Sequence, residues 1–308
     1  MNTNTKIIPC TFEYHSPNSL EEVLRLLQNR DAALLAGGTD LINQLKLKTA
    51  APSSIVFPGA VEELKEFSAA GAAGLEIGAL VPMRDVEICA EVKGSYRCLY
   101  EAINSIGGMQ IRNSATIAGN IANASPAADT PPALIVLGAE CETAHFDETS
   151  KSVRTRRLPV EKLFKGPGST VLEPGEIITG ISVPKPEGSY GTAFFRSTRV
   201  KLDVAKANCA VFLQVEGDTC KEVRVAAGAV APVPVRGKHV EDALRGRVIS
   251  EEEIKRAAAE IEKDIRPISD VRSTDAYRNR VMKVLVRDAL LTAWARSRGD
   301  ETVQGERV

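Results

Sequence analysis

Two segments of the chain combine glycines with runs of backbone N–H groups, a pattern that suits the binding of a phosphate. The first consists of Leu34, Leu35, Ala36, Gly37, Gly38, Thr39, Asp40 and Leu41. The second begins with Thr116, Ile117, Ala118, Gly119 and Asn120 and continues to residue 129. Glycine lets the backbone approach a ligand closely, and N–H groups at turns and helix starts supply positive potential without a lysine. Two such segments facing each other could hold a pyrophosphate.

Neutral side chains in and after these segments add further hydrogen-bonding groups. Hydroxyls come from Thr39, Thr116 and Ser125, and amides from Asn120 and Asn123. Asp129 could accept hydrogen bonds from a sugar hydroxyl. A Gly-Gly-Thr-Asp run after a strand is also typical of a plain turn with a helix cap, so composition alone leaves both interpretations open.

The segment 107–139 is unusual in its lack of charge. The chain averages 26% charged residues, yet these residues include only Arg112 and Asp129 as charged side chains. Small uncharged residues with many free backbone groups are typical of a loop packed closely against something large. We therefore predict a loop here that packs against a ligand, with the rest of it covered by a partner or by the C-terminal domain of the chain itself.

Other catalytic and metal-binding patterns are missing from the sequence. It contains no GxGxxG, no GxxxxGK[ST] and no GxSxG. The cysteines form no CxxC pair and the three histidines are scattered, so we predict no metal site. With no recognisable acid–base machinery of its own, the chain would need a bound cofactor to supply redox chemistry.

Length and composition limit the other possibilities. The chain has 308 residues, 44% of them hydrophobic, and a net charge of −1. These values predict a globular protein of two domains with no nucleic-acid partner. The sequence has neither a secretory leader nor an apolar run long enough for a membrane span, so we expect a cytoplasmic protein.

Periodicity predicts the elements that must hold these segments. A capping box at 19–22 starts a helix, followed by a strand at 32–35, a helix capped by Thr39 or Asp40 and a strand at 54–57. Later predictions are a strand at 75–80, helices at 84–92 and 96–106, a strand at 176–184, strands at 208–215 and 222–227, and helices at 251–264 and 275–296. The basic run 151–160 is interpreted as solvated surface.

This order of elements predicts the domain organisation. Residues 1–184 would form an α/β domain with subdomains of about 1–58 and 59–184. Residues 185–296 would form a smaller α+β domain, because strands are followed there by helices. The polar end, 297–308, is predicted to be disordered.

The motifs resemble those of the FAD-binding subunit of the xanthine dehydrogenase and carbon monoxide dehydrogenase family. The similar stretches are LAGGTDL at 35–41, IRNSATIAGNI at 111–121, NASPAAD at 123–129, RVKLDVA at 199–205 and YRNRVMKVLVR at 277–287. They occur in the family's order over nearly the whole chain.

This resemblance implies a fold, a cofactor and partners. The fold would be a two-subdomain FAD-binding domain of the vanillyl-alcohol oxidase (PCMH) type, followed by an α+β C-terminal domain. Segments 34–41 and 116–120 would wrap the FAD pyrophosphate, and Asp129 would contact the ADP part. Ile106 and Ile178 would flank the flavin ring.

The resemblance also implies that FAD carries the chemistry, so no catalytic residue is assigned. A small subunit with [2Fe–2S] clusters and a molybdopterin-binding large subunit would supply electrons in a dimer of heterotrimers. The acceptor would be NAD⁺, a quinone, oxygen or another molecule.

Two positions depart from the family pattern. Many members have glycine at the position of Ala118, and a left-handed backbone there would make alanine costly. Many carry a lysine where this chain has Phe195 with Arg196 beside it, which leaves the charge near the flavin ring open.

Two other functions are compatible with the motifs. One is a self-sufficient oxidase of the vanillyl-alcohol oxidase type, and the other is a scaffold that has lost its flavin. A flavin spectrum separates the scaffold from the rest, and turnover without partners separates the oxidase from the subunit.

Overall fold

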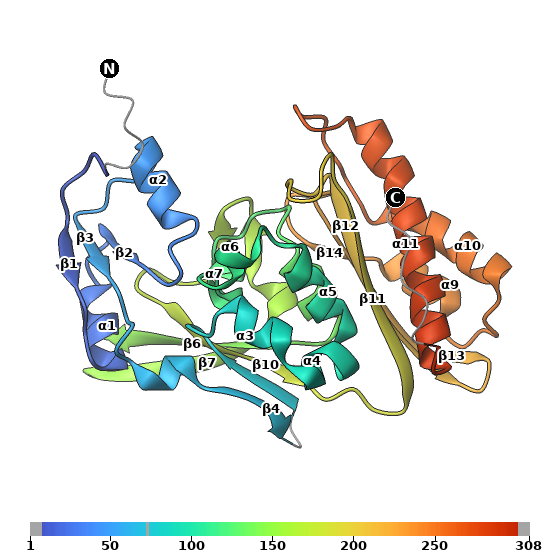
Figure 1. Cartoon of the computed structure of the whole chain (residues 1–308), viewed down its shortest axis with the longest axis horizontal. Coiled ribbons are helices and arrows are strands. Elements are labelled where there is room, and N and C mark those ends of the chain that lie inside the picture. Colours follow the sequence, from blue (N-terminus) through green and yellow to red (C-terminus); the bar gives the residue numbers. More distant parts are fainter. Residues whose placement is uncertain (1–7, 72–73, 301–308) are drawn as a thin grey trace.

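The computed structural model describes residues 8–71 and 74–300. Figure 1 shows three units in a row: a small N-terminal sheet, a larger sheet with helices beside it, and a C-terminal sheet covered by long helices. Their sheets have the strand orders β1-β3-β2, β4-β5-β10-β6-β7 and β11-β12-β13-β14, and a further pair is formed by β8 and β9.

The N-terminal unit is a parallel three-stranded sheet with two helices. Its elements are β1 (Glu13–His15), α1 (Leu20–Leu26), β2 (Ala32–Leu34), α2 (Leu41–Leu47) and β3 (Ser54–Val56). The predicted capping box is confirmed for its first half, because the Ser19 side chain accepts a hydrogen bond from the Glu22 N–H, whereas the Glu22 carboxylate accepts from the Asn18 N–H instead of the Ser19 N–H. The predicted cap of α2 is only partly right: Asp40 occupies the cap position but its side chain makes no capping bond.

The middle unit is an antiparallel five-stranded sheet packed against helices. The five strands of the sheet are β4 (Phe67–Gly71), β5 (Gly74–Gly78), β6 (Glu140–Asp147), β7 (Ser152–Pro159) and β10 (Ile177–Pro184), and a separate pair is formed by β8 (Phe164–Gly166) and β9 (Ser169–Thr170). Its helices are η1 (Glu62–Lys65), α3 (Met83–Ile88), α4 (Ala90–Ser95), α5 (Arg97–Ser105), α6 (Met109–Arg112), α7 (Ile117–Ala122), α8 (Thr130–Val136) and η2 (Val160–Lys162). One apolar core joins this sheet to α1 and β3 of the N-terminal unit.

The prediction of a long loop at 107–139 was wrong, because the segment contains α6, α7 and α8. Thr116 caps α7 with its side chain, and prolines occupy the first turn of α8, where a missing N–H costs no hydrogen bond. All seven residues of α8 are buried. The lack of charge therefore reflects burial within the protein as well as any ligand.

Two other segments of the middle unit differ from the predictions. The helix expected at 84–92 is interrupted at Cys89, whose backbone is extended between α3 and α4. The basic run at 151–160 coincides with β7, an edge strand paired only with β6, and most of its side chains are exposed. β6 and β7 were not predicted.

The C-terminal domain is an antiparallel sheet covered by helices, with its own apolar core. Its elements are β11 (Ser189–Ser197), β12 (Ala207–Glu216), β13 (Thr219–Gly228), β14 (Val235–Arg236), α9 (Lys238–Leu244), α10 (Glu251–Ala259), η3 (Glu260–Lys263) and α11 (Asp275–Ser297). The predicted strands and helices are present, while β11, β14 and α9 were missed. The predicted tail begins inside the last turn of α11, and residues 301–308 lie outside the described residues.

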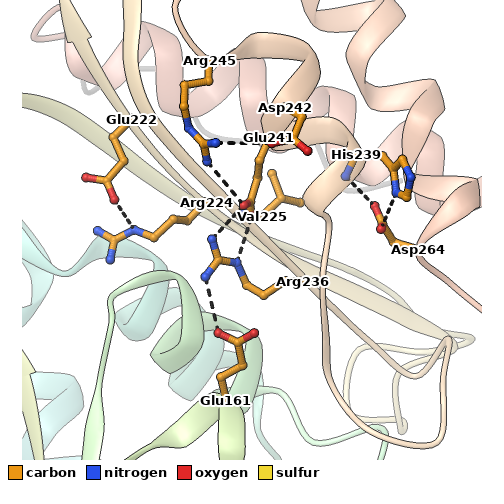
Figure 2. Close-up of polar contacts among 10 residues, drawn as sticks. All are labelled: Glu161, Glu222, Arg224, Val225, Arg236, His239, Glu241, Asp242, Arg245 and Asp264. Carbon is orange, nitrogen blue, oxygen red and sulfur yellow. Dashed lines mark hydrogen bonds and ion pairs between the residues drawn. The ribbon is translucent and has the colours of Figure 1, made fainter.

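A network of charged side chains connects the middle unit to the C-terminal domain (Figure 2). Glu241 of α9 holds Arg236 at 2.7 Å and also accepts a hydrogen bond from the Val225 N–H at 2.9 Å. Arg236 in turn reaches Glu161 of η2 at 3.5 Å. Its guanidinium thus links η2 of the middle unit to α9 of the C-terminal domain.

Within residues 8–71 and 74–300, no helix combines the length and apolar character required to cross a bilayer.

Candidate functional site

A cavity of about 900 Å³ lies between the N-terminal unit, the middle unit and the C-terminal domain. Its lining includes most of the residues that the sequence nominated: Leu34, Ala36, Gly37, Gly38, Thr39, Asp40, Leu41, Ile106, Thr116, Ala118, Gly119, Asn120, Asn123, Ser125, Asp129 and Ile178. Two nominated residues are not in the lining. Leu35 continues the β2 ladder by donating to the Val56 carbonyl, and Ile117 is buried in the core. The two glycine-containing segments therefore face one cavity.

The 34–41 loop is held by a close backbone contact. A Cβ atom added at Gly37 would lie 1.8 Å from the carbonyl oxygen of Ser114, so only glycine fits. Gly38 has a φ of +72°, the left-handed region that favours glycine. The described structure gives the N–H groups of Thr39 and Asp40 no hydrogen-bond acceptor. These donors point to an anionic ligand.

The 116–120 segment is the start of a helix. The Thr116 hydroxyl accepts a hydrogen bond from the Gly119 N–H at 3.0 Å. Ala118 and Gly119 both lie in α7, and neither has a positive φ. The alanine at 118 consequently imposes no left-handed strain. Asn120 accepts a hydrogen bond from Thr130 through its side-chain oxygen, at 2.6 Å, which leaves its NH₂ group as a donor.

Asp129 lies in the cavity wall with both carboxylate oxygens already engaged. One oxygen is 2.7 Å from Arg196 Nη1, and the other accepts from Asn208 Nδ2 at 2.7 Å. Burial raises the pKa of Asp129 above its ordinary value, while the charge of Arg196 and the Asn208 bond act in the opposite direction. A sugar hydroxyl would have to use a remaining lone pair of an oxygen that the protein already holds.

Buried ion pairs fix the backbone near Ile106 and Ile178, the two isoleucines in the cavity lining. Arg112 binds Glu87 and donates to the carbonyls of Ile106 and Gly107, each at 3.0 Å, which fixes the turn before α6. Burial would raise the pKa of Glu87, but hydrogen bonds from Arg112 and Arg84 outweigh it and the pKa is lowered.

Beside Ile178, the buried carboxylate of Glu176 accepts hydrogen bonds from Arg156 and Thr143. These bonds outweigh the effect of burial and lower the pKa of Glu176. Each isoleucine therefore lies in a segment whose backbone is held by a buried carboxylate, Glu87 for Ile106 and Glu176 for Ile178.

Strand alternation places Phe195 and Arg196 on opposite faces of β11. Phe195 packs against the C-terminal core, whereas Arg196 lines the cavity and pairs with Asp129. Arg196 also donates to the carbonyl of Lys201. The cation at this wall of the cavity is therefore Arg196.

Sequence reasoning missed several lining residues. They are Asn29, Arg30, Leu80, Gly107, Ile111, Leu172, Pro174, Gly175, Leu202, Asp203 and Val204, among others. Residues 202–204 belong to the 199–205 motif already noticed, so that motif was a usable signal. Nothing in the local pattern around Arg30 marks it as part of a site.

No cysteine of the described residues lines this cavity. In the part of the chain that the structure describes, His, Cys, Asp and Glu side chains form no group of three or more that could hold a metal ion. Cys98, Cys141, Cys209 and Cys220 are buried and unpaired. Burial raises the pKa of Cys98 to about 12 and those of Cys141 and Cys220 to about 11, and it also raises the pKa of Cys209.

The cavity has the properties that a dinucleotide-like ligand requires. Sites for small molecules and cofactors occupy roughly 300–1,000 Å³, so this one is at the large end. Its neutral donors lie where two glycine-containing segments meet, and Ile106 and Ile178 provide apolar surface elsewhere in the lining. The donor set and volume therefore fit a long ligand with a phosphate group and an aromatic part.

Comparisons with known proteins find matches over most of the chain. A family model described as "FAD binding domain in molybdopterin dehydrogenase" matches residues 10–186, and one described as "CO dehydrogenase flavoprotein C-terminal domain" matches residues 192–293. The chain is 34% identical to the glyceraldehyde dehydrogenase medium chain of Sulfolobus acidocaldarius, over 91% of this chain and 98% of that one.

Solved structures agree with these matches. The chain superposes on carbon monoxide dehydrogenase from Hydrogenophaga pseudoflava with a TM-score of 0.88 at 32% identity, covering 94% and 99% of the two chains. For quinoline 2-oxidoreductase from Pseudomonas putida the TM-score is 0.85 at 28% identity, covering 94% and 98%.

Proposed function

The chain belongs to the FAD-binding subunits of the molybdopterin dehydrogenases, the family of the carbon monoxide and xanthine dehydrogenase flavoproteins. We therefore propose that it is an electron-transferring subunit that binds one FAD. The observation that carries the proposal is the cavity onto which both glycine-containing segments open. FAD, when bound, would supply the redox chemistry that the side chains lack.

The residues around the cavity would share the work of holding FAD. The 34–41 loop and the 116–120 segment would bind the pyrophosphate through backbone N–H groups and neutral side chains. Asp129 would contact the ADP part, and Ile106 and Ile178 would enclose the flavin ring. The FAD-binding portion would then be of the vanillyl-alcohol oxidase (PCMH) type.

Arg196 would place a positive charge at the cavity wall. Its charge is shared with Asp129, so its effect on a bound ring would be weaker than that of an unpaired cation. The protein's contribution is therefore orientation, exclusion of water and a tuned charge, rather than proton transfer.

We propose partners of the kind that such subunits need. A small subunit with [2Fe–2S] clusters would deliver electrons from a molybdopterin-binding large subunit, in a dimer of heterotrimers. NAD⁺ or another acceptor would take the electrons. Within the segment 107–139, Met109 and Ile111 of α6 are 51% and 43% exposed, and Ile111 also lines the cavity, which makes α6 a candidate contact.

One feature of the lining argues against a self-sufficient oxidase. No His or Cys of the described residues lines the cavity, so none is placed to link a flavin covalently. The scaffold alternative is disfavoured because the cavity and its donors are present.

The test starts with the purified chain. It should be yellow, with about one FAD per chain that acid precipitation releases, and with no iron or molybdenum. Alone it should show at most diaphorase activity, passing electrons from a reduced nicotinamide to a dye. Expression with its genomic neighbours should yield a complex containing [2Fe–2S] clusters and molybdopterin, in which substrate oxidation reduces the flavin. Oxidation of an organic substrate by the isolated chain at an ordinary enzymatic rate would establish the oxidase alternative.

A further inference from the structure

The 277–287 motif does not line the cavity, yet its second residue connects to a loop that does. Arg278 is in the first turn of α11, and its side chain is about 6% exposed. Its Nη1 donates to the carbonyl of Ala229 at 2.8 Å, and its Nη2 pairs with Asp270 at 2.7 Å. The guanidinium thus joins the end of β13 to the loop before α11.

Ala229 is the connection between Arg278 and the cavity. Its φ is 62°, a left-handed backbone that is unfavourable for alanine, so surrounding contacts must hold it there. The Ala229 N–H donates to the carbonyl of Pro126 at 2.7 Å. Arg278 therefore fixes one side of a residue whose other side fixes the 123–129 loop.

The 123–129 loop contributes directly to the cavity lining through Asn123, Ser125 and Asp129. One further anchor comes from the middle unit, where the Gly168 N–H donates to the Ala124 carbonyl at 2.9 Å, and the others come from the C-terminal domain. Asn208 donates to the Ala128 carbonyl at 3.1 Å and to Asp129, and Arg196 pairs with Asp129. A change that loosens Ala229 would release the part of the loop that these anchors do not reach.

The chemistry of Arg278 suggests more than a contribution to folding. Among the described atoms its Nε is buried and has no hydrogen-bond partner, which is unfavourable. An apolar side chain at such a position often stabilises a protein as well as a buried ion pair does. Stability alone thus gives no reason for an arginine here.

We infer that Arg278 is a positioning residue for the cofactor: through Ala229 and Pro126 it sets the shape of the 123–129 loop. Asp270 is the residue that orients Arg278. It is itself held by hydrogen bonds from the N–H groups of Arg272 and Ser273. A short loop remote from the lining would in this way affect how tightly FAD is bound. The inference rests on the proposed FAD function.

The experiment compares variants of the full chain by titrating apo-protein with FAD and following flavin fluorescence. Arg278→Met removes both bonds and should raise the Kd about tenfold, the effect of one lost charge-assisted hydrogen bond. Arg278→Lys keeps one donor and should restore part of the affinity. Arg280→Met, an exposed position on the same helix, is the matched control and should bind like wild type.

Asp270→Asn keeps the size of the side chain and weakens its bond to Arg278. The Asp270 side chain is 28% exposed and the substitution changes no buried packing, so we expect this variant to fold even where Arg278→Met does not. We expect its Kd to rise about threefold, since a neutral bond is roughly half as strong as a charged one. The visible circular dichroism of bound flavin should change in the same variants, because the loop contacts the cofactor differently.

Two results would overturn the inference. One is wild-type Kd and circular dichroism in both Arg278→Met and Asp270→Asn. The other is a lowered melting temperature with an unchanged Kd measured well below it, which would make Arg278 a purely structural residue. Failure of the wild-type chain to bind FAD is a different result, and it would refute the proposed function instead.

Discussion

The two segments that face the cavity are held in place in different ways. The 34–41 loop depends on its own backbone and on one tight contact, where Gly37 meets Ser114. Leu35 also donates to the Val56 carbonyl of the neighbouring strand, and the remaining described bonds are local, such as Ile42 N–H to Gly38 and Asn43 to Thr39. The 116–129 segment begins with an equally local bond, from the Gly119 N–H to Thr116, but it ends in contacts from a different domain.

Those distant contacts come from Arg196, Asn208 and Ala229, all beyond residue 190. The comparison indicates that the C-terminal domain helps to complete the cofactor site and does not only cover it. A defect in the first loop should act through sterics at one point. A defect in the second should depend on the state of the C-terminal domain. The following predictions test this difference.

The largest effect should come from the first loop. Gly37→Ala would place a carbon 1.8 Å from the Ser114 carbonyl, so the two segments must separate. We expect FAD affinity to fall at least about a hundredfold, as severe overpacking costs about 3 kcal/mol or more. Calorimetric titration measures this. Gly94→Ala is the control, because a Cβ there meets no atom within 4 Å. Wild-type affinity in the Gly37 variant would show that the close approach is not needed.

The next effect should appear in stability. Asp129→Ala leaves Arg196 without its partner in a largely buried position, and we expect a loss of about 2 kcal/mol in the free energy of unfolding. This exceeds the effect of one hydrogen bond to a ligand. Urea denaturation of the apo-protein measures it.

The control for that prediction is the double variant Asp129→Ala with Arg196→Met. Removing both charges should recover part of the lost stability, because no unpaired charge remains. Additive losses in the double variant would mean that the pair is not coupled.

Gly119→Val should have a moderate effect on binding. Glycine at 119 is helical, so the harm comes from crowding rather than from a left-handed backbone. An added Cβ would lie 3.0 Å from the Thr116 hydroxyl oxygen that caps α7. Losing the cap costs about 1 kcal/mol, and the side chain also narrows the cavity, so we expect FAD affinity to fall about tenfold. Thr116→Ser, which keeps the capping oxygen, should bind FAD like wild type.

The smallest effect should be a pH dependence of the free energy of unfolding, which arises at the turn before the 116–129 segment. The pKa of Glu87 in the folded protein lies below its ordinary value of 4.5. Its ion pair with Arg112 is therefore fully stabilising above that value and is lost as the pH falls through the lowered pKa. Stability should decline on acidification below pH 4.5, and in Glu87→Gln this component of the decline should disappear. An identical pH profile in the variant would assign the decline to other carboxylates.

Local pattern was enough to predict much of this site. The glycines at 37 and 38, the cap at Ser19 and the long helix that became α11 all follow from neighbours within a few residues. The segment that contains α6, α7 and α8 was misjudged, because an absence of charge indicates burial without saying whether a ligand or the protein covers the chain. Pairing of Asp129 with Arg196 joins residues 67 positions apart, which no periodicity reveals. The inward direction of Arg196 depends on the register of β11, a strand that was missed.

The positions of the buried thiols make it possible to follow how the protein unfolds. Cys98 and Cys141 lie in the middle unit, and Cys209 and Cys220 lie in the C-terminal domain. With raised pKa values and no access to solvent, these sulfurs cannot react with an alkylating reagent until their surroundings open. Cys10 and Cys89 are partly accessible and should be alkylated first. Peptide mass spectrometry can follow the order in which the remaining four cysteines are alkylated. That order reports which of the two cores opens first. Comparing this order of alkylation with and without FAD would show whether the ligand stabilises one core or both.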